Sequence, residues 1–253
     1  MAGLSPTELV LIHERGAPVL SVLDTTTMTL RDLPGEQPEG TGEPDDLGDW
    51  IFADVAVQAQ DAIIARYAPD DEAHVGLEVL RVDLDDGART MLFAEPLLLP
   101  AATSASGGLP PVDIDVDGSG VIRIATPGAR IVLDADGAEL NRTAQEAELP
   151  HVAVSPAGTA LWWGGGQRAS EERGVVTEGS DAAREAIEER SASRSDTAGL
   201  GDSLIMIDAQ GAQHPLPFLH GANAAVWTGS SWVVAIGGEG GGVLVRLTPP
   251  KGQ

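Results

Sequence analysis

The chain has 253 residues and a formal net charge of −24, with 39 Asp and Glu against 15 Lys and Arg. This charge repels phosphate groups, so nucleic acids and anionic membranes are disfavoured as partners. Cysteine is absent, which excludes disulfides and thiolate metal sites.

Membrane and export signals are missing from the sequence. No stretch approaches the roughly 18 consecutive apolar residues that a membrane span needs. Residues 1–22 lack the basic start, apolar run and small-residue cleavage site of a signal peptide. We therefore expect an acidic, soluble protein in the cytoplasm.

Three apolar segments with alternating polarity open the chain, at residues 8–13, 18–24 and 28–33. Alternation with a period of two predicts β-strands. We interpret them as the second, third and fourth strands of a first four-stranded unit. Residues 1–6 are a candidate for its inner strand.

Four later segments share one pattern, an alternating run followed by a turn and a second apolar run: 54–65, 113–124, 151–162 and 223–234. Their valines align at Val57, Val116, Val154 and Val226, at intervals of 59, 38 and 72 residues. Because the long intervals contain inserts, the underlying period is near 38, which is close to that of a four-stranded propeller blade.

Further strand pairs follow three of these segments and end in Asp- and Gly-containing turns, at residues 80–87, 131–137 and 205–211. Asp and Gly adopt the backbone conformations that tight hairpins require. Residues 222–226, 232–236 and 243–247 are interpreted as the first three strands of a last unit.

The sequence thus predicts an all-β protein, a single β-propeller of about five four-stranded blades over residues 1–253. About eighteen strands can be placed, so two strands of five complete blades are unaccounted for. A double-sheet sandwich or a barrel is the main alternative. An α/β fold is disfavoured because helical periodicity is almost absent.

One turn carries a resemblance to known propeller repeats. Val154–Leu161, with Ser155, Pro156, Gly158 and Thr159, resembles the S-P-x-G-T turn of the YVTN, TolB-like and WD40-like propellers. Arg81–Phe93 resembles their outer hairpin. The resemblance implies a propeller fold and a role in interaction, and it implies no particular activity.

Three segments with the composition of loops interrupt the repeat. Residues 34–49 are acidic and rich in Pro and Gly, residues 95–111 look like a linker, and residues 167–200 are polar. Such compositions bury too little apolar surface to offset the loss of chain entropy. The last insert is interpreted as a solvated loop with a short helix at 181–190, or alternatively as a partner-binding arm that orders on contact.

The string Asp113, Asp115, Asp117 and Gly118 begins as an EF-hand calcium loop does. The position that needs a bidentate Glu is Ile124, and no helix flanks the string. A strand with one polar face, entering a glycine turn, is the alternative interpretation. A divalent cation such as calcium is the only cofactor that the sequence suggests.

A second candidate site comes from the aligned repeat, because the residue three before each aligned valine is polar: Asp54, Asp113, His151 and Asn223. First strands line the central channel of a propeller, so these side chains are predicted to meet at one mouth of it, as a ligand site with oxygen and nitrogen donors. The alternative is that strand starts are polar because they meet solvent.

No nucleophile elbow, zinc-protease motif or phosphate loop is present. The favoured function is therefore a non-catalytic scaffold that binds a protein partner. The alternative is a metal-dependent hydrolase or lyase that uses the channel mouth.

Trp162 and Trp163 are neighbours on one strand and must face opposite sides. Burial between blades on both sides is expected, unless one of them is an exposed contact anchor.

Overall fold

The computed structural model describes residues 2–14, 18–33, 51–69, 75–97, 112–126, 128–144, 149, 151–164, 204–216, 222–238 and 241–248. These residues contain nineteen strands. Within this part of the chain, no helix is long and apolar enough to cross a membrane.

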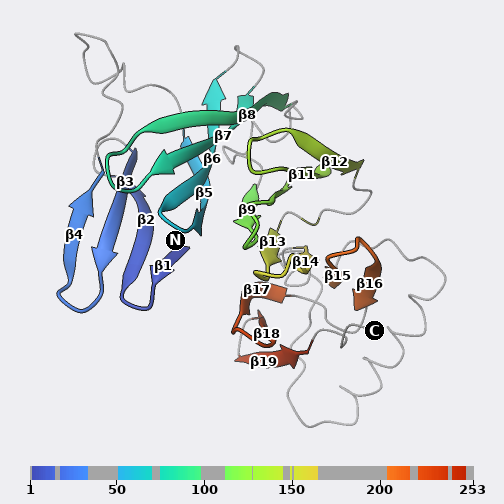
Figure 1. Cartoon of the computed structure of the whole chain (residues 1–253). Coiled ribbons are helices and arrows are strands. Elements are labelled where there is room, and N and C mark those ends of the chain that lie inside the picture. The colour runs from blue at the N-terminus through green and yellow to red at the C-terminus, as the bar shows by residue number, and fades with distance from the viewer. Residues whose placement is uncertain are drawn as a thin grey trace.

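The strands form five separate antiparallel sheets, each built from strands that are consecutive in the chain (Figure 1). The first sheet consists of β1 (Ala2–Ser5), β2 (Glu8–Glu14), β3 (Pro18–Asp24) and β4 (Thr29–Asp32). The second consists of β5 (Ile51–Gln58), β6 (Asp61–Pro69), β7 (Val75–Asp83) and β8 (Arg89–Leu97).

The later sheets follow the same plan. The third consists of β9 (Asp113–Val116), β10 (Ile122–Ala125), β11 (Ala129–Leu133) and β12 (Glu139–Ala144). The fourth consists of β13 (His151–Val154), β14 (Ala160–Trp163), β15 (Leu204–Ile207) and β16 (Gln213–Leu216). The fifth contains three described strands, β17 (Ala222–Trp227), β18 (Trp232–Gly238) and β19 (Gly241–Leu247).

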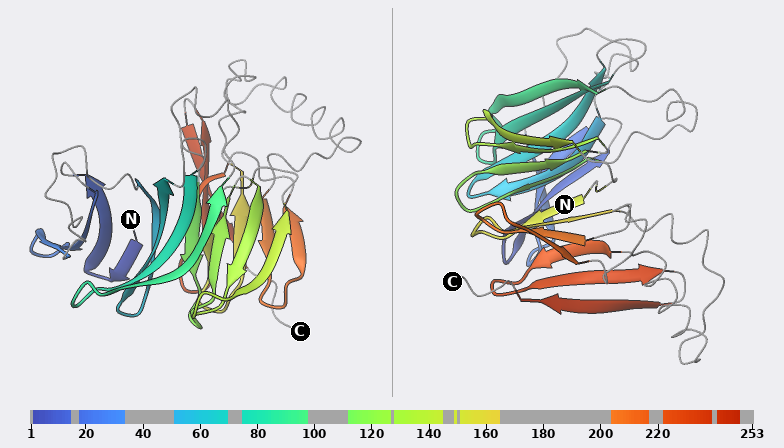
Figure 2. Two further views of the ribbon diagram at one scale, coloured as in Figure 1. Left: turned by 90° about the horizontal axis from the view of Figure 1, so that it is seen from above. Right: turned by 90° about the vertical axis from the view of Figure 1, so that its right-hand side faces the viewer.

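The sheets are the blades of a five-bladed β-propeller. Their first strands lie next to one another in chain order, β1 beside β5, then β9, β13 and β17. Figure 2 shows successive sheets packed face to face from two further sides. The predicted all-β fold and five-blade architecture are confirmed. Residues 2–5 form the inner strand of the first blade, as proposed for residues 1–6.

Asp-x-x-Gly turns close several hairpins in the way that the sequence predicts. Asp134 accepts hydrogen bonds from the backbone N–H groups of Asp136 (3.0 Å) and Ala138 (2.8 Å) through Oδ1. Gly137 has a φ of 88°, a left-handed conformation that glycine adopts without strain. A side chain at Gly137 would also collide with the carbonyl oxygen of Leu92, since a Cβ would lie 2.1 Å from it. The turn therefore needs glycine both for its backbone and for the close approach of the second blade.

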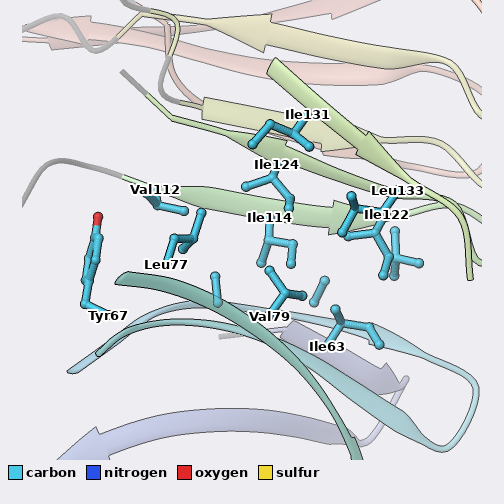
Figure 3. Packing of buried hydrophobic residues seen from close by; sticks show 13 residues of the cluster. Ile63, Tyr67, Leu77, Val79, Val112, Ile114, Ile122, Ile124, Ile131 and Leu133 are labelled. Carbon is cyan, nitrogen blue, oxygen red and sulfur yellow. The ribbon is translucent and has the colours of Figure 1, made fainter. Parts of the chain in front are cut away.

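The hydrophobic core is divided among the blade interfaces. One buried cluster lies between each pair of consecutive blades, four in the described part of the chain. Figure 3 shows the cluster between the second and third blades, where Leu77 and Val79 of β7 face Ile114, Ile122 and Ile124 of β9 and β10. Because inner blades bury both faces, a strand such as β14 (Ala160–Trp163) is apolar on both sides.

The positions of Trp162 and Trp163 are explained by this arrangement of the core. Trp162 packs in the cluster between the third and fourth blades, and Trp163 packs in the cluster between the fourth and fifth. Both side chains are buried. The expected burial between blades on both sides is therefore confirmed.

The inserts predicted at 34–49 and 167–200 lie outside the described residues. The linker predicted at 95–111 also lies mostly outside them, and Glu95–Leu97 are the last residues of β8. This strand continues further than the sequence suggested because it pairs with β7 from Val82↔Arg89 to Val75↔Leu97.

Candidate functional site

Two of the four polar residues predicted at the channel mouth tie neighbouring blades together. Oδ2 of Asp54 accepts a hydrogen bond from the backbone N–H of Ile114 at 3.0 Å. Oδ2 of Asp113 accepts one from the N–H of Val152 at 2.9 Å. Ile114 and Val152 occupy equivalent positions, two residues before the aligned valines. The same aspartate contact therefore repeats across two successive blade interfaces.

The carboxylate of Asp115 makes a second contact between the third and fourth blades, further along the same strands. Oδ2 of Asp115 accepts a hydrogen bond from the N–H of Val154 at 2.5 Å. Oδ1 of Asp115 accepts one from the N–H of Val116 at 2.8 Å. Strands β9 and β13 belong to different sheets. The carboxylate of Asp115 therefore accepts hydrogen bonds from backbone N–H groups that a neighbouring strand would accept within one sheet.

The side chains of Asp54, Asp113 and His151 form a connected row, which we call the channel row. Asp54 and Asp113 share a hydrogen bond between their carboxyl groups. Nδ1 of His151 lies 3.4 Å from Oδ2 of Asp113, and the imidazole stacks on Trp163 with ring centroids 5.5 Å apart. Three of the four predicted ligand residues are therefore brought together.

Burial and mutual contact separate the pKa values of the channel row. Burial, followed by the hydrogen bond and charge of Asp113, raises the pKa of Asp54 to about 8. Burial alone would also raise the pKa of Asp113, but hydrogen bonds from His151, Asp54 and the Val152 N–H outweigh it and hold this pKa below its usual range. At neutral pH, Asp54 is therefore the protonated donor and Asp113 the carboxylate acceptor of one shared proton.

Burial also raises the pKa of Asp115, to about 6. Hydrogen bonds from the Val154 and Val116 N–H groups and the charge of Arg123 oppose this rise. The inner strand of the third blade thus carries two carboxyl groups with pKa values shifted in opposite directions.

Asn223 is placed differently from the other three residues. It lies in β17 at a register shift between Ala222 and Ala224, and its side chain is exposed. The bulge interrupts the alternation that puts the equivalent residues of β9 and β13 into the row.

The three aspartates of the calcium-like string point to different partners. Asp113 and Asp115 accept hydrogen bonds from the fourth blade, as described above. Asp117 accepts hydrogen bonds from the N–H and hydroxyl of Ser119 at 2.8 and 2.6 Å and pairs with Arg123 at 3.1 Å. Among the described residues, no group of three or more His, Asp or Glu side chains is placed to hold a metal ion. The alternative interpretation, a half-polar strand that enters a glycine turn, describes residues 113–120 correctly.

Arg123 belongs to this region and was missed by the sequence reasoning. Nη2 of Arg123 donates to the carbonyl of Gly158 at 2.9 Å, so the Asp117–Arg123 pair also bridges to the fourth blade. Arg31 and Arg81 make similar bridges, to the carbonyls of Leu84 and Ala135. An arginine between two isoleucines in β10 was the available signal, because a charge in an apolar strand needs a partner.

Comparison with known proteins does not identify a family for this chain. No family model matches the chain, and no curated protein matches it. A protein of unknown function from Bacteroides caccae is 12% identical, with 97% of this chain and 74% of that chain covered and a TM-score of 0.48. An uncharacterised protein from Listeria monocytogenes EGD-e is 9% identical, with 93% and 57% covered and a TM-score of 0.43. Membership of the YVTN, TolB-like or WD40-like families stays a prediction.

Proposed function

We propose that this propeller is a non-catalytic scaffold that binds a protein partner through one face of its fifth blade. This face, called the free face, lies on the side of the sheet opposite the fourth blade. Residues directly opposite each other in adjacent strands share a face. The register of β17, β18 and β19 therefore defines the free face as Ala224, Val226, Val233, Ala235, Leu244 and Arg246.

The exposure of Val226 is the observation that carries the proposal. The aligned valines Val116 and Val154 pack against the preceding blade and are 9% and 7% exposed, whereas Val226 lies on the face of its sheet that points away from the preceding blade and is 58% exposed. Leu244, on the same face, is 73% exposed. The free face thus has the composition of a blade interface, and contiguous exposed apolar surface of this kind marks interaction sites.

The channel row supports a structural role better than a catalytic one. Asp54, Asp113 and Asp115 each accept a backbone hydrogen bond from the following blade. A carboxylate that is occupied by such a structural hydrogen bond is poorly suited to bind a substrate. The net charge of −24 favours a basic partner by attracting it over long range.

The scaffold is tested by comparing two variants with matched exposure. Leu140, in the outer strand of the third blade, is 58% exposed, as Val226 is. Val226→Lys is expected to lose at least tenfold in affinity for a partner co-purified from the native source, and Leu140→Lys to retain it. Both should keep the wild-type melting temperature. Equal binding by the two variants would contradict the choice of this face.

A metal-dependent hydrolase or lyase at the channel mouth is the second candidate. Its support is the pair Asp54 and Asp113, since adjacent carboxyl groups with separated pKa values are typical of acid–base sites. This candidate predicts that the purified protein retains a divalent ion, which Asp113→Ala loses. A metal-free preparation whose melting temperature does not respond to calcium, magnesium or zinc would count against it.

A further inference from the structure

Strand β19 is the outermost described strand of the fifth blade, although it occupies the third place in its sheet. In each of the other four blades, a fourth strand covers the third: β4, β8, β12 and β16. The outer edge of β19 therefore carries backbone N–H and C=O groups where the other blades pair theirs.

The side chains of β19 are also more exposed than those of other third strands. Leu204, Ile205 and Met206 of β15 are all buried. Val243 and Leu244 of β19 are 59% and 73% exposed. The composition of β19 is thus apolar, like that of a covered strand, although β19 lies at the edge of the described sheet.

The outer strands of the other blades carry features that oppose pairing with another chain. β4 and β16 have only four residues each, and β16 contains Pro215. β8 and β12 each pair through a shifted register, and β12 carries Glu139 and Arg142. Short length, proline, bulges and charges are the known protections of sheet edges.

β19 has none of these protections except a single charge. It pairs with β18 without a register shift over seven residue pairs, from Trp232↔Leu247 to Gly238↔Gly241. Its one charged residue is Arg246, whose Nε donates to the hydroxyl of Ser231 at 2.8 Å. A long, regular and apolar edge of this kind is a template for an added strand.

We infer that an extended segment of a second protein, with net positive charge, pairs with β19 and supplies the fourth strand of the fifth blade. This inference rests on the proposed scaffold function and names the way in which the partner is bound. Residues that alternate along the added strand would lie beside Val245 on one side and Leu244 on the other, so the segment is apolar at alternate positions.

The charge of the chain decides between a foreign partner and a second copy. Two copies would bring together two net charges of −24, which repel each other. A basic segment is attracted by the same charge, and its apolar residues cover Leu244. Backbone hydrogen bonds then provide affinity, and the side chains provide specificity.

The test uses the full chain and a nine-residue peptide of alternating valine and lysine, with hydrogen exchange measured at those amides of residues 243–247 that point away from β18. The peptide is expected to slow exchange there at least tenfold. A peptide with glutamate in place of lysine, and a lysine peptide with a central proline, should not. Leu244→Lys should weaken peptide binding at least tenfold, and Leu140→Lys should leave it unchanged.

Three outcomes would overturn the inference. Slow exchange in the isolated monomer at the amides that point away from β18 would show that the chain covers its own edge. Protection that grows with protein concentration, without peptide, would assign the edge to a second copy. If the lysine peptides with and without proline slow exchange equally, the binding depends on charge and not on strand pairing. If strand pairing fails while Val226→Lys still abolishes partner binding, the scaffold stands and the pairing does not.

Discussion

The carboxylate of Asp113 accepts the backbone N–H of Val152 at 2.9 Å and so joins the inner strands of the third and fourth blades. Asp54 makes the equivalent bond to Ile114 one blade earlier. Adjacent blades lack the backbone ladder that joins strands within one sheet. These side chains therefore provide directional contacts across interfaces that are otherwise apolar.

Removal of this contact should destabilise the fold. Asp113→Ala leaves the Val152 N–H without its acceptor, and an unsatisfied buried donor costs about 1–3 kcal/mol. We expect a loss of that size in the free energy of unfolding, measured by urea denaturation at pH 7. Asp136→Ala, at an exposed turn position, is the control and should stay within about 0.5 kcal/mol of wild type. Equal losses of unfolding free energy in the two variants would argue that the hydrogen bond between Asp113 and Val152 does not stabilise the fold.

The shifted pKa of Asp54 predicts a pH-dependent stability. The pKa in the folded state is about 8, above the usual 3.8, so the folded state holds a proton that the unfolded state releases. This contribution is complete below about pH 4 and is lost as the pH rises through about 8. The free energy of unfolding should therefore fall between pH 5 and pH 9, as measured by urea denaturation across that range.

Asp54→Asn keeps a neutral side chain at every pH and should flatten this profile above the pKa of Asp115, which is about 6. Asp24→Asn is the control, because hydrogen bonds from Thr26 lower the pKa of Asp24 to about 2. Any stabilisation from Asp24 is lost only as the pH falls through about 2, so its variant should keep the wild-type slope above pH 5. A wild-type slope in Asp54→Asn would assign the pH dependence to another group.

Two glycines with the same backbone conformation should respond differently to alanine. Gly137 and Gly211 have φ angles of 88° and 86°. Alanine in this conformation costs about 1–2 kcal/mol, which is the expected loss for Gly211→Ala because nothing lies within 4 Å of its Cβ. Gly137→Ala should lose a further 1–3 kcal/mol or so, since its Cβ would overlap the carbonyl of Leu92. Thermal unfolding of both variants measures the difference, and equal losses would contradict the close contact between the second and third blades.

The Asp117–Arg123 pair should show a measurable coupling. The two side chains are largely buried, and Arg123 also binds the Gly158 carbonyl. A double-mutant cycle of Asp117→Ala and Arg123→Ala, followed by urea denaturation, is expected to give a coupling of about 1–3 kcal/mol. The exposed pair Arg142–Glu139 is the comparison and should give less than about 1 kcal/mol. A coupling near zero for the first pair would mean that Arg123 acts through Gly158 alone.

The sequence alone determined the repeat and the position of most strands. Alternating polarity and Asp–Gly turns are local properties, set by the geometry of a strand and of a tight turn, so they can be recognised without the neighbouring blade. The aligned valines identified the inner strands, and the neighbouring tryptophans were correctly expected to face two interfaces. Asp54, Asp113 and His151 lie together for the same reason, because equivalent places in a repeat meet around one axis, and their use as a ligand site stays a prediction.

Only the tertiary structure decided what these residues contact. Asp113, Asp115 and Asp117 look like one ligand set in the sequence, but the backbone donors of the next blade and the side chain of Arg123 turn them to separate partners. Val226 has the same local pattern as Val116 and Val154, but it faces away from the preceding blade, which covers the other two, and it is exposed. Burial is a property of the neighbour as well as of the residue, so it appears only when the blades are assembled.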